Sequence, residues 1–246
     1  MSLFKNAAFH VSVASLNDLP EDSVCEVAFA GRSNAGKSSA INTLADHTRL
    51  AYVSKTPGRT QLLNYFRLGD GKYFVDLPGY GFAKAPAEIR DQWENLLAPY
   101  LVHRTALAGL VLIMDSRHPM TDLDMQMIEW FAQSGKPIHV VLSKADKLTR
   151  NEQAQVLRDV KSGLTAFGER CSLQLFSSLK RTGVEEAEKV LASWLGMTVP
   201  AKTDATGAKT VPGKVARPRK RNAMGWSART ADKNKAVQKQ KPPAIE

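Results

Sequence analysis

The sequence is short of cysteine and of long apolar runs. Its 246 residues include only two cysteines, Cys25 and Cys171, too widely spaced for a disulfide framework or a cysteine zinc site. The best apolar run, 106–114, stops at Asp115 and falls well short of the roughly 18 residues that a membrane-spanning helix needs. The first twenty residues lack the basic-then-apolar pattern of a secretion signal. We therefore expect a soluble, cytoplasmic protein with no membrane insertion.

Patterns typical of metal sites and hydrolase triads are also missing. Neither Ser143 nor Ser177 has the histidine and acid arrangement of a triad. The chain is 43% hydrophobic and 24% charged, which is ordinary globular usage and excludes a wholly disordered or fibrous chain. The five histidines show no metal-ligand spacing with one another or with cysteine: His10, His47, His103, His118 and His139.

The positive charge is concentrated at the C-terminal end. Residues 197–246 hold 12 of the 34 Lys and Arg and three of the 24 acids, so residues 1–196 keep 22 bases and 21 acids. This tail has Trp226 as its only aromatic residue and cannot bury enough apolar surface to offset the entropy of ordering. It is interpreted as a polyanion-binding arm, with a passive solubilising tail and a membrane-surface arm as alternatives.

The rest of the chain alternates short apolar runs with amphipathic segments. This order predicts right-handed βαβ units and an α/β fold, with a mainly parallel six-stranded sheet and helices on both faces. Gly69-Asp70-Gly71 predicts a hairpin that adds one antiparallel strand. The predicted strands are 24–30, 62–68, 72–76, 107–114, 138–142 and 173–176, and the predicted helices are 37–45, 86–104, 121–133, 149–167 and 184–195.

The strongest motif follows the first of these strands. It matches G-x-x-x-x-G-K-[ST] and opens a helix, so its backbone N–H groups would surround phosphate oxygens. Lys37 would reach the β- and γ-phosphates and the Ser38 hydroxyl would bind Mg²⁺. The residues of this phosphate loop are Gly31, Arg32, Ser33, Asn34, Ala35, Gly36, Lys37 and Ser38.

Three further signals indicate which nucleotide is bound. The D-x-x-G run Asp76, Leu77, Pro78 and Gly79 follows a strand; its Asp would order Mg²⁺ through a water and its Gly N–H would contact the γ-phosphate. Asp146 would accept two hydrogen bonds from guanine, a donor pair that adenine lacks. It lies in Ser143, Lys144, Ala145 and Asp146, which resembles the guanine-reading [NT]-K-x-D motif with Ser in place of Asn or Thr. A short run, Ser177, Ser178 and Leu179, resembles the motif whose backbone contacts the guanine O6.

Taken together, residues 9–195 resemble the EngB/YihA/YsxC family of Era/TrmE-like bacterial ribosome-assembly GTPases. The residues that carry the resemblance are 26–39, 55–61 and 76–81. It implies the P-loop NTPase G-domain fold and three regions: an N-terminal extension (1–22) packing on the G-domain, an EngB-type G domain (23–196), and the basic tail (197–246), which lies outside the resemblance.

The resemblance also implies roles for residues that spacing alone does not assign. Thr60 would complete the Mg²⁺ shell with Ser38, and residues 79–86 would form switch II. Tyr80 stands where Ras-type enzymes carry a water-orienting glutamine, so slow intrinsic hydrolysis is expected. Asn34 matches a P-loop asparagine that supports K⁺, with loop bracing as the alternative role. Switch I would fold over the nucleotide with Gly58, Arg59, Thr60, Gln61 and Leu62.

The implied function is a GTP/GDP switch in assembly of the large ribosomal subunit, acting on its precursor and rRNA and needed for cell division and septation. A monomer is expected. Two alternatives stay open: a division factor with no direct ribosome contact, and a general nucleic-acid binder acting through its basic tail. The first would bind a division protein, and the second would bind nucleic acid independently of nucleotide and with a steep dependence on salt.

Overall fold

A computed structural model describes residues 2–51, 62–80 and 93–198. The chain divides into two units, 1–201 and 202–246, and the second lies entirely outside the described residues. No helix in the described ranges is long and apolar enough to cross a membrane. The predictions for the basic tail and for most of switch I therefore concern residues whose structure is not described.

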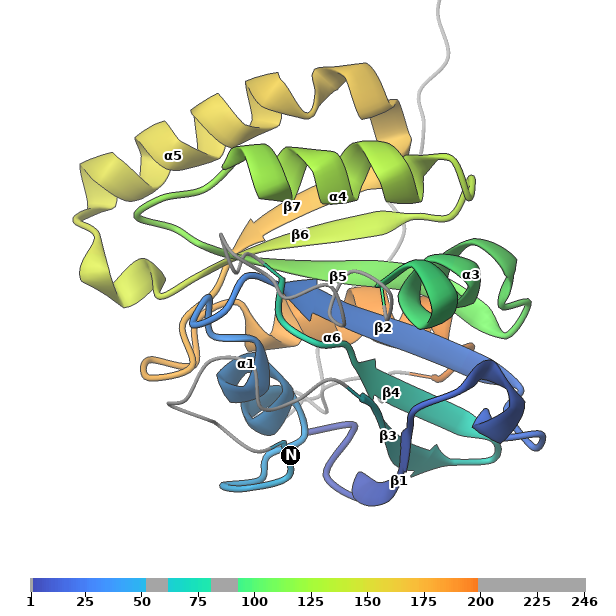
Figure 1. Cartoon of the computed structure of the whole chain (residues 1–246). Helices are drawn as coiled ribbons and strands as arrows, with labels where there is room; N and C mark the ends of the chain where they lie inside the picture. The colour runs from blue at the N-terminus through green and yellow to red at the C-terminus, as the bar shows by residue number, and fades with distance from the viewer. Residues whose placement is uncertain (1, 52–61, 81–92, 199–246) are drawn as a thin grey trace, which may run out of the picture. The chain divides into compact units, whose positions relative to one another are not determined.

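The described part of the chain forms a seven-stranded sheet in the order β1-β3-β4-β2-β5-β6-β7 (Figure 1). β3 runs antiparallel to both of its neighbours, and the remaining pairs are parallel. The predicted fold, a mainly parallel sheet with one antiparallel strand, is confirmed. The strands are β1 (Ala8–Val13), β2 (Cys25–Gly31), β3 (Leu63–Gly69), β4 (Lys72–Asp76), β5 (Leu107–Asp115), β6 (Ile138–Ser143) and β7 (Cys171–Leu175).

The sheet has one strand more than the six expected, because β1 adds to its edge. This strand is mostly exposed and pairs on one side only, with β3. Its register shifts between Phe9 and Val11, so a bulge interrupts the two-residue alternation by which a strand is recognised in a sequence. The residues before β1 also pack on the sheet, since Phe4 is buried with its ring 4.7 Å from the ring of Phe74.

Helices cover both faces of the sheet, as predicted (Figure 1). Alternate residues of β5 point to opposite faces: Leu112 packs in the cluster that includes α3, α4 and α5, and Ile113 packs in the cluster that includes α1 and α6. This two-sided burial explains why β5 is an uninterrupted apolar run. The helices are α1 (Lys37–Leu44), α3 (Ala98–His103), α4 (Asp122–Ala132), α5 (Arg150–Gly163) and α6 (Val184–Trp194).

Two helices begin where the capping signals predict. Thr121 opens α4 with its backbone N–H bonded to Asp124 at 3.1 Å, and Thr149 opens α5 with its N–H bonded to Glu152 at 2.7 Å. α5 ends at Gly163, earlier than expected, and 3₁₀ turns cover residues 165–170. Of the helix predicted over 86–104, the described part is a π-helical turn, Trp93–Leu97, followed by α3.

Candidate functional site

The predicted motifs meet at one edge of the sheet. The phosphate loop follows β2, the D-x-x-G run follows β4, and the two guanine motifs follow β6 and β7. These four strands are parallel, so their carboxyl ends share one edge, where ligands bind in open α/β sheets.

The phosphate loop has a backbone that its glycines make possible. Gly36 immediately precedes α1 at φ 101°, which a residue with a Cβ rarely adopts. Gly31 lies so close to β5 that an added Cβ would sit 2.6 Å from the Ile113 carbonyl oxygen. The loop therefore carries the chain directly from a buried strand into the first turn of α1, where backbone N–H groups lack helical partners and suit an anion.

Lys37 and Asp76, predicted from separate motifs, are in contact. The Lys37 ammonium forms an ion pair with Asp76 Oδ1, and the two side chains are only 11% and 7% exposed. The pairing of β2 with β4 brings them together, since Phe29 aligns with Asp76. A phosphate entering the loop would meet a lysine that is already held at the site by a carboxylate.

The D-x-x-G run lies directly against the phosphate loop. Leu77 N–H donates to the Phe29 carbonyl at 3.0 Å, which continues the β2–β4 pairing beyond the strands. Ser33 N–H donates to the Tyr80 carbonyl at 3.1 Å, and a Cβ added to Gly79 would lie 3.4 Å from Ser33 N. The backbone of Gly79 therefore lies against the phosphate loop.

Tyr80 is buried, and its side chain bonds to a helix. Its hydroxyl donates to Asp124 Oδ1 of α4 at 2.8 Å, and the residue is 6% exposed. Burial, reinforced by the Asp124 carboxylate, raises the pKa of the Tyr80 hydroxyl well above its usual range. The side chain in the usual glutamine position is thus engaged in the protein interior. Sequence reasoning missed the Asp124 contact, because the only signal at that residue was its helix-capping role.

Ser143, which stands where the guanine motif usually has Asn or Thr, contacts the phosphate loop. Its buried hydroxyl lies 3.0 Å from the Met114 carbonyl oxygen and also contacts the Ala35 carbonyl oxygen of the phosphate loop. Lys144 braces the same loop, because its ammonium donates to the Asn34 carbonyl at 2.6 Å. The guanine motif and the phosphate loop are therefore tied together by two side chains.

Asp115 is a site residue that the sequence analysis missed. It ends β5 and accepts hydrogen bonds from Lys144 at 2.9 Å and from Arg117 at 2.6 Å. Burial acts to raise the pKa of Asp115, but these bonds outweigh it and hold the pKa well below the usual range. The available signal is an acid at the end of a buried apolar strand, which in the sequence marks only where the apolar run stops.

The two guanine motifs also contact each other. Asp146 Oδ1 accepts a hydrogen bond from the Ser177 hydroxyl at 2.5 Å, and Ala145 N–H donates to the Phe176 carbonyl at 3.0 Å. Ser177 thus anchors one oxygen of the carboxylate that would read guanine, and Phe176 anchors the backbone immediately before it. Leu179, two residues after Ser177, carries an apolar side chain that is 71% exposed.

Several predicted site residues lie outside the described residues: Gly58, Arg59, Thr60 and Gln61. Leu62 is described and immediately precedes β3. The proposed Mg²⁺ pair of Ser38 and Thr60 is therefore represented by Ser38 alone, at the second position of α1. Switch II is described only for Gly79 and Tyr80.

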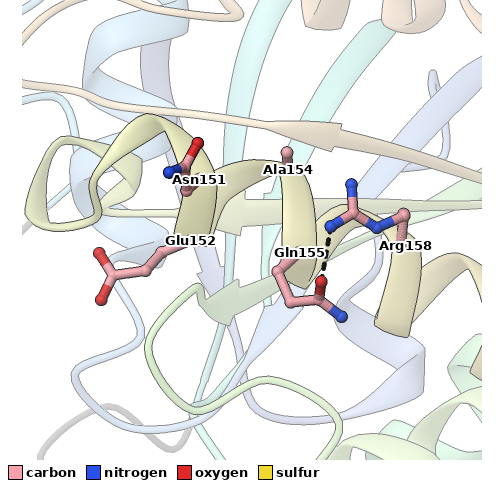
Figure 2. Close-up of a pocket in the computed structure, with 5 residues that line it drawn as sticks. All are labelled: Asn151, Glu152, Ala154, Gln155 and Arg158. Carbon is pink, nitrogen blue, oxygen red and sulfur yellow. Dashed lines mark hydrogen bonds between the residues drawn. The ribbon is translucent and has the colours of Figure 1, made fainter.

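A shallow hollow lies away from these motifs, on α5. Figure 2 shows that one helix supplies its lining, with the Arg158 guanidinium donating to the side-chain oxygen Oε1 of Gln155 at 2.5 Å. Because all five lining residues are exposed, the hollow has none of the convergent, buried polar groups of the sheet edge. The lining residues are Asn151, Glu152, Ala154, Gln155 and Arg158.

The described residues fit a guanine nucleotide. A helix N-terminus and Lys37 suit phosphates, and an anchored carboxylate, Asp146, suits the N1–H and amino group of guanine. Ser38 offers a hydroxyl oxygen of the kind that Mg²⁺ accepts.

Comparison with known proteins identifies the family. Residues 26–144 match the family model described as "50S ribosome-binding GTPase". The chain is 65% identical over 204 residues to "Probable GTP-binding protein EngB" of Dechloromonas aromatica (strain RCB), covering 82% of this chain and 93% of that protein. It is 64% identical over 196 residues to the protein of the same name in Azoarcus sp. (strain BH72), covering 79% of this chain and 94% of that protein.

Solved structures show the same fold at lower identity. A structure titled as a probable GTP-binding protein engB matches with a TM-score of 0.56 and 20% identity over 70% of this chain and 99% of that one. A single-residue variant of Era from Aquifex aeolicus matches with a TM-score of 0.58 and 20% identity over 73% of this chain and 59% of that one. Since the sequence relatives match across almost their whole length, the chain belongs to the EngB family of GTP-binding proteins and is a GTPase, which hydrolyses GTP.

Proposed function

We propose that this GTPase is a nucleotide-controlled switch in assembly of the large ribosomal subunit, acting in the cytoplasm on precursor particles and their rRNA. The observation that carries the proposal is the convergence of four nucleotide motifs at one sheet edge in a chain 65% identical to an EngB protein. The description of the matching family model names the 50S ribosome. A structural neighbour, Era, was solved with MgGDPNP and a segment of 16S ribosomal RNA, with a TM-score of 0.56 and 21% identity.

The proposed nucleotide contacts follow the motifs. Phosphates would lie on the backbone of residues 31–38, where Lys37 would exchange its bond to Asp76 for bonds to phosphate oxygens. Ser38 and Thr60 would hold Mg²⁺, which supplies neutralisation of phosphate charge when it is bound. Asp146 would select guanine, and Ser177, Ser178 and Leu179 would border the base.

Slow intrinsic hydrolysis is part of the proposal. The Tyr80 hydroxyl donates to Asp124 in the interior, so this residue supplies no amide to orient an attacking water. A partner or a monovalent cation would then accelerate the reaction. Asn34 is the candidate for K⁺, because its side chain is exposed while its carbonyl is engaged by Lys144.

The switch would act by ordering loops. Bound γ-phosphate and Mg²⁺ would hold Thr60 and Gly79, and hydrolysis would release them. The basic tail 197–246 would add affinity for rRNA by releasing counterions. The dependence of cell division and septation on the protein would then follow from ribosome supply, with a monomer as the active form.

Co-sedimentation with ribosomal subunits at about 0.15 M salt tests the proposal. The full chain and a chain ending at Ala201 would each be tested with GDP and with a non-hydrolysable GTP analogue. Large-subunit binding that needs the analogue and survives truncation supports the switch. Binding that ignores the nucleotide and disappears with the tail supports a general nucleic-acid binder. No binding under any condition supports a division factor without ribosome contact.

A further inference from the structure

One contact beside the nucleotide site has no role in the established activity. Tyr80 and Asp124 are both buried, at 6% and 1% exposure, and are 44 residues apart in the chain. The hydroxyl of Tyr80 donates to Asp124 Oδ1, and the other carboxylate oxygen accepts from the backbone N–H and the hydroxyl of Thr121 at 3.1 and 2.8 Å. One carboxylate therefore joins the residue after the D-x-x-G glycine to the first turn of α4.

The backbone of Tyr80 is fixed at the same time. Its carbonyl accepts from Ser33 N–H, and it forms a parallel bridge with Arg32 of the phosphate loop. The residue that follows Gly79 is therefore anchored twice: the phosphate loop bonds the carbonyl of Tyr80, and α4 bonds its hydroxyl. Such double anchoring restricts the conformations that the Gly79 backbone can adopt.

We infer that Asp124 is a positioning residue: through Tyr80 it holds Gly79 against the phosphate loop, ready for the γ-phosphate. The inference rests on the proposed contact of Gly79 N–H with that phosphate. A pre-positioned N–H group costs less ordering entropy on binding, so the pair favours GTP over GDP, which has no γ-phosphate. Asp124 therefore raises the affinity for GTP relative to GDP and does not change the affinity for both nucleotides equally.

The structure also supplies a matched control. Tyr100 is buried, and its hydroxyl donates to the buried carboxylate of Glu26 at 2.9 Å. Tyr100 bonds to Glu26, which lies near the start of β2, whereas Tyr80 follows the end of β4. The two tyrosine bonds therefore lie at opposite ends of the parallel strands. Tyr80→Phe and Tyr100→Phe thus remove the same kind of bond, and only the first is next to Gly79.

The experiment measures dissociation constants for GDP and for a non-hydrolysable GTP analogue in the full chain. Tyr80→Phe is expected to weaken analogue binding by about tenfold, the scale of one buried hydrogen bond to a carboxylate, and to leave GDP binding within about twofold. Tyr100→Phe should leave the ratio of the two constants unchanged. Asp124→Ala also removes the two bonds from Thr121, so only the ratio is compared. It should change the ratio of the two constants as Tyr80→Phe does, and the double variant should change it no further, because each variant removes the Tyr80–Asp124 bond.

The inference is overturned if Tyr80→Phe leaves the ratio of the two dissociation constants unchanged, whether neither constant changes or both rise by the same factor. Gly79→Pro, which removes the backbone N–H, separates this failure from failure of the proposed γ-phosphate contact. If Gly79→Pro weakens analogue binding more than GDP binding and Tyr80→Phe does not, the contact stands and the positioning role is wrong. If Gly79→Pro leaves analogue binding intact, the contact itself is wrong, and the positioning role fails with it.

Discussion

Ser143 offers a direct test of how the guanine motif supports the phosphate loop. Ser143→Ala removes a hydroxyl donor that lies within reach of two carbonyl oxygens, those of Met114 and Ala35. The two carbonyls belong to the end of β5 and to the phosphate loop, so the hydroxyl lies between these two segments. The side chain is buried, so water cannot readily replace the lost hydroxyl.

The size of the effect follows from this geometry. A hydroxyl has one proton, so one full hydrogen bond is lost although two acceptors are in reach. A buried acceptor left without a partner costs about 1–3 kcal/mol, and we expect about 2 kcal/mol of lost stability for Ser143→Ala. Because the Ala35 carbonyl belongs to the phosphate loop, we also expect GDP affinity to fall by about tenfold as that loop loses its support.

Urea unfolding and fluorescent-GDP titration measure the two quantities. Ser143→Thr, which keeps the hydroxyl, should restore both. Ser134→Ala is the control: it removes a hydroxyl that donates to the Phe131 carbonyl at 2.7 Å near the end of α4, so it should change stability without changing GDP affinity. If Ser143→Ala binds GDP as tightly as the unmodified chain, the bracing argument is refuted.

Three other predictions concern single side chains. Arg104→Met should lower the free energy of unfolding in urea by about 3–5 kcal/mol, since it leaves the buried Glu26 carboxylate without its cation; a loss below about 1 kcal/mol would contradict this. Burial lowers the pKa of His139, so the unfolded chain takes up a proton that the folded chain resists as the pH falls below about 6.5. The folded state should therefore become less stable as the pH is lowered across that range. His139→Gln should flatten the dependence of the thermal unfolding temperature on pH; equal slopes for the two proteins would show that His139 is not the group responsible. Asp146→Ala should weaken GDP binding by about 100-fold in the same titration, from the loss of charge-assisted bonds to guanine, and a change under about threefold would remove its proposed role.

The local elements were predictable because their signals are local. The hairpin turn at 69–71, the capping residues Thr121 and Thr149, and the apolar run of β5 each reflect physics within a few neighbouring residues. β1 was missed for the same reason. Its exposed side chains and bulge give no periodic pattern, and its pairing with β3 links residues as far apart as Ala8 and Arg67.

The sequence by itself determined the nucleotide motifs and their order along parallel strands, and hence that they share one edge of the sheet. Only the tertiary structure decided which side chains meet there: Lys37 with Asp76, Ser143 with the phosphate loop, and Tyr80 with Asp124. The physical reason is that these partners lie between 39 and 108 residues apart. Their contacts depend on strand register and on which helix covers each face, properties that arise only when distant segments pack together.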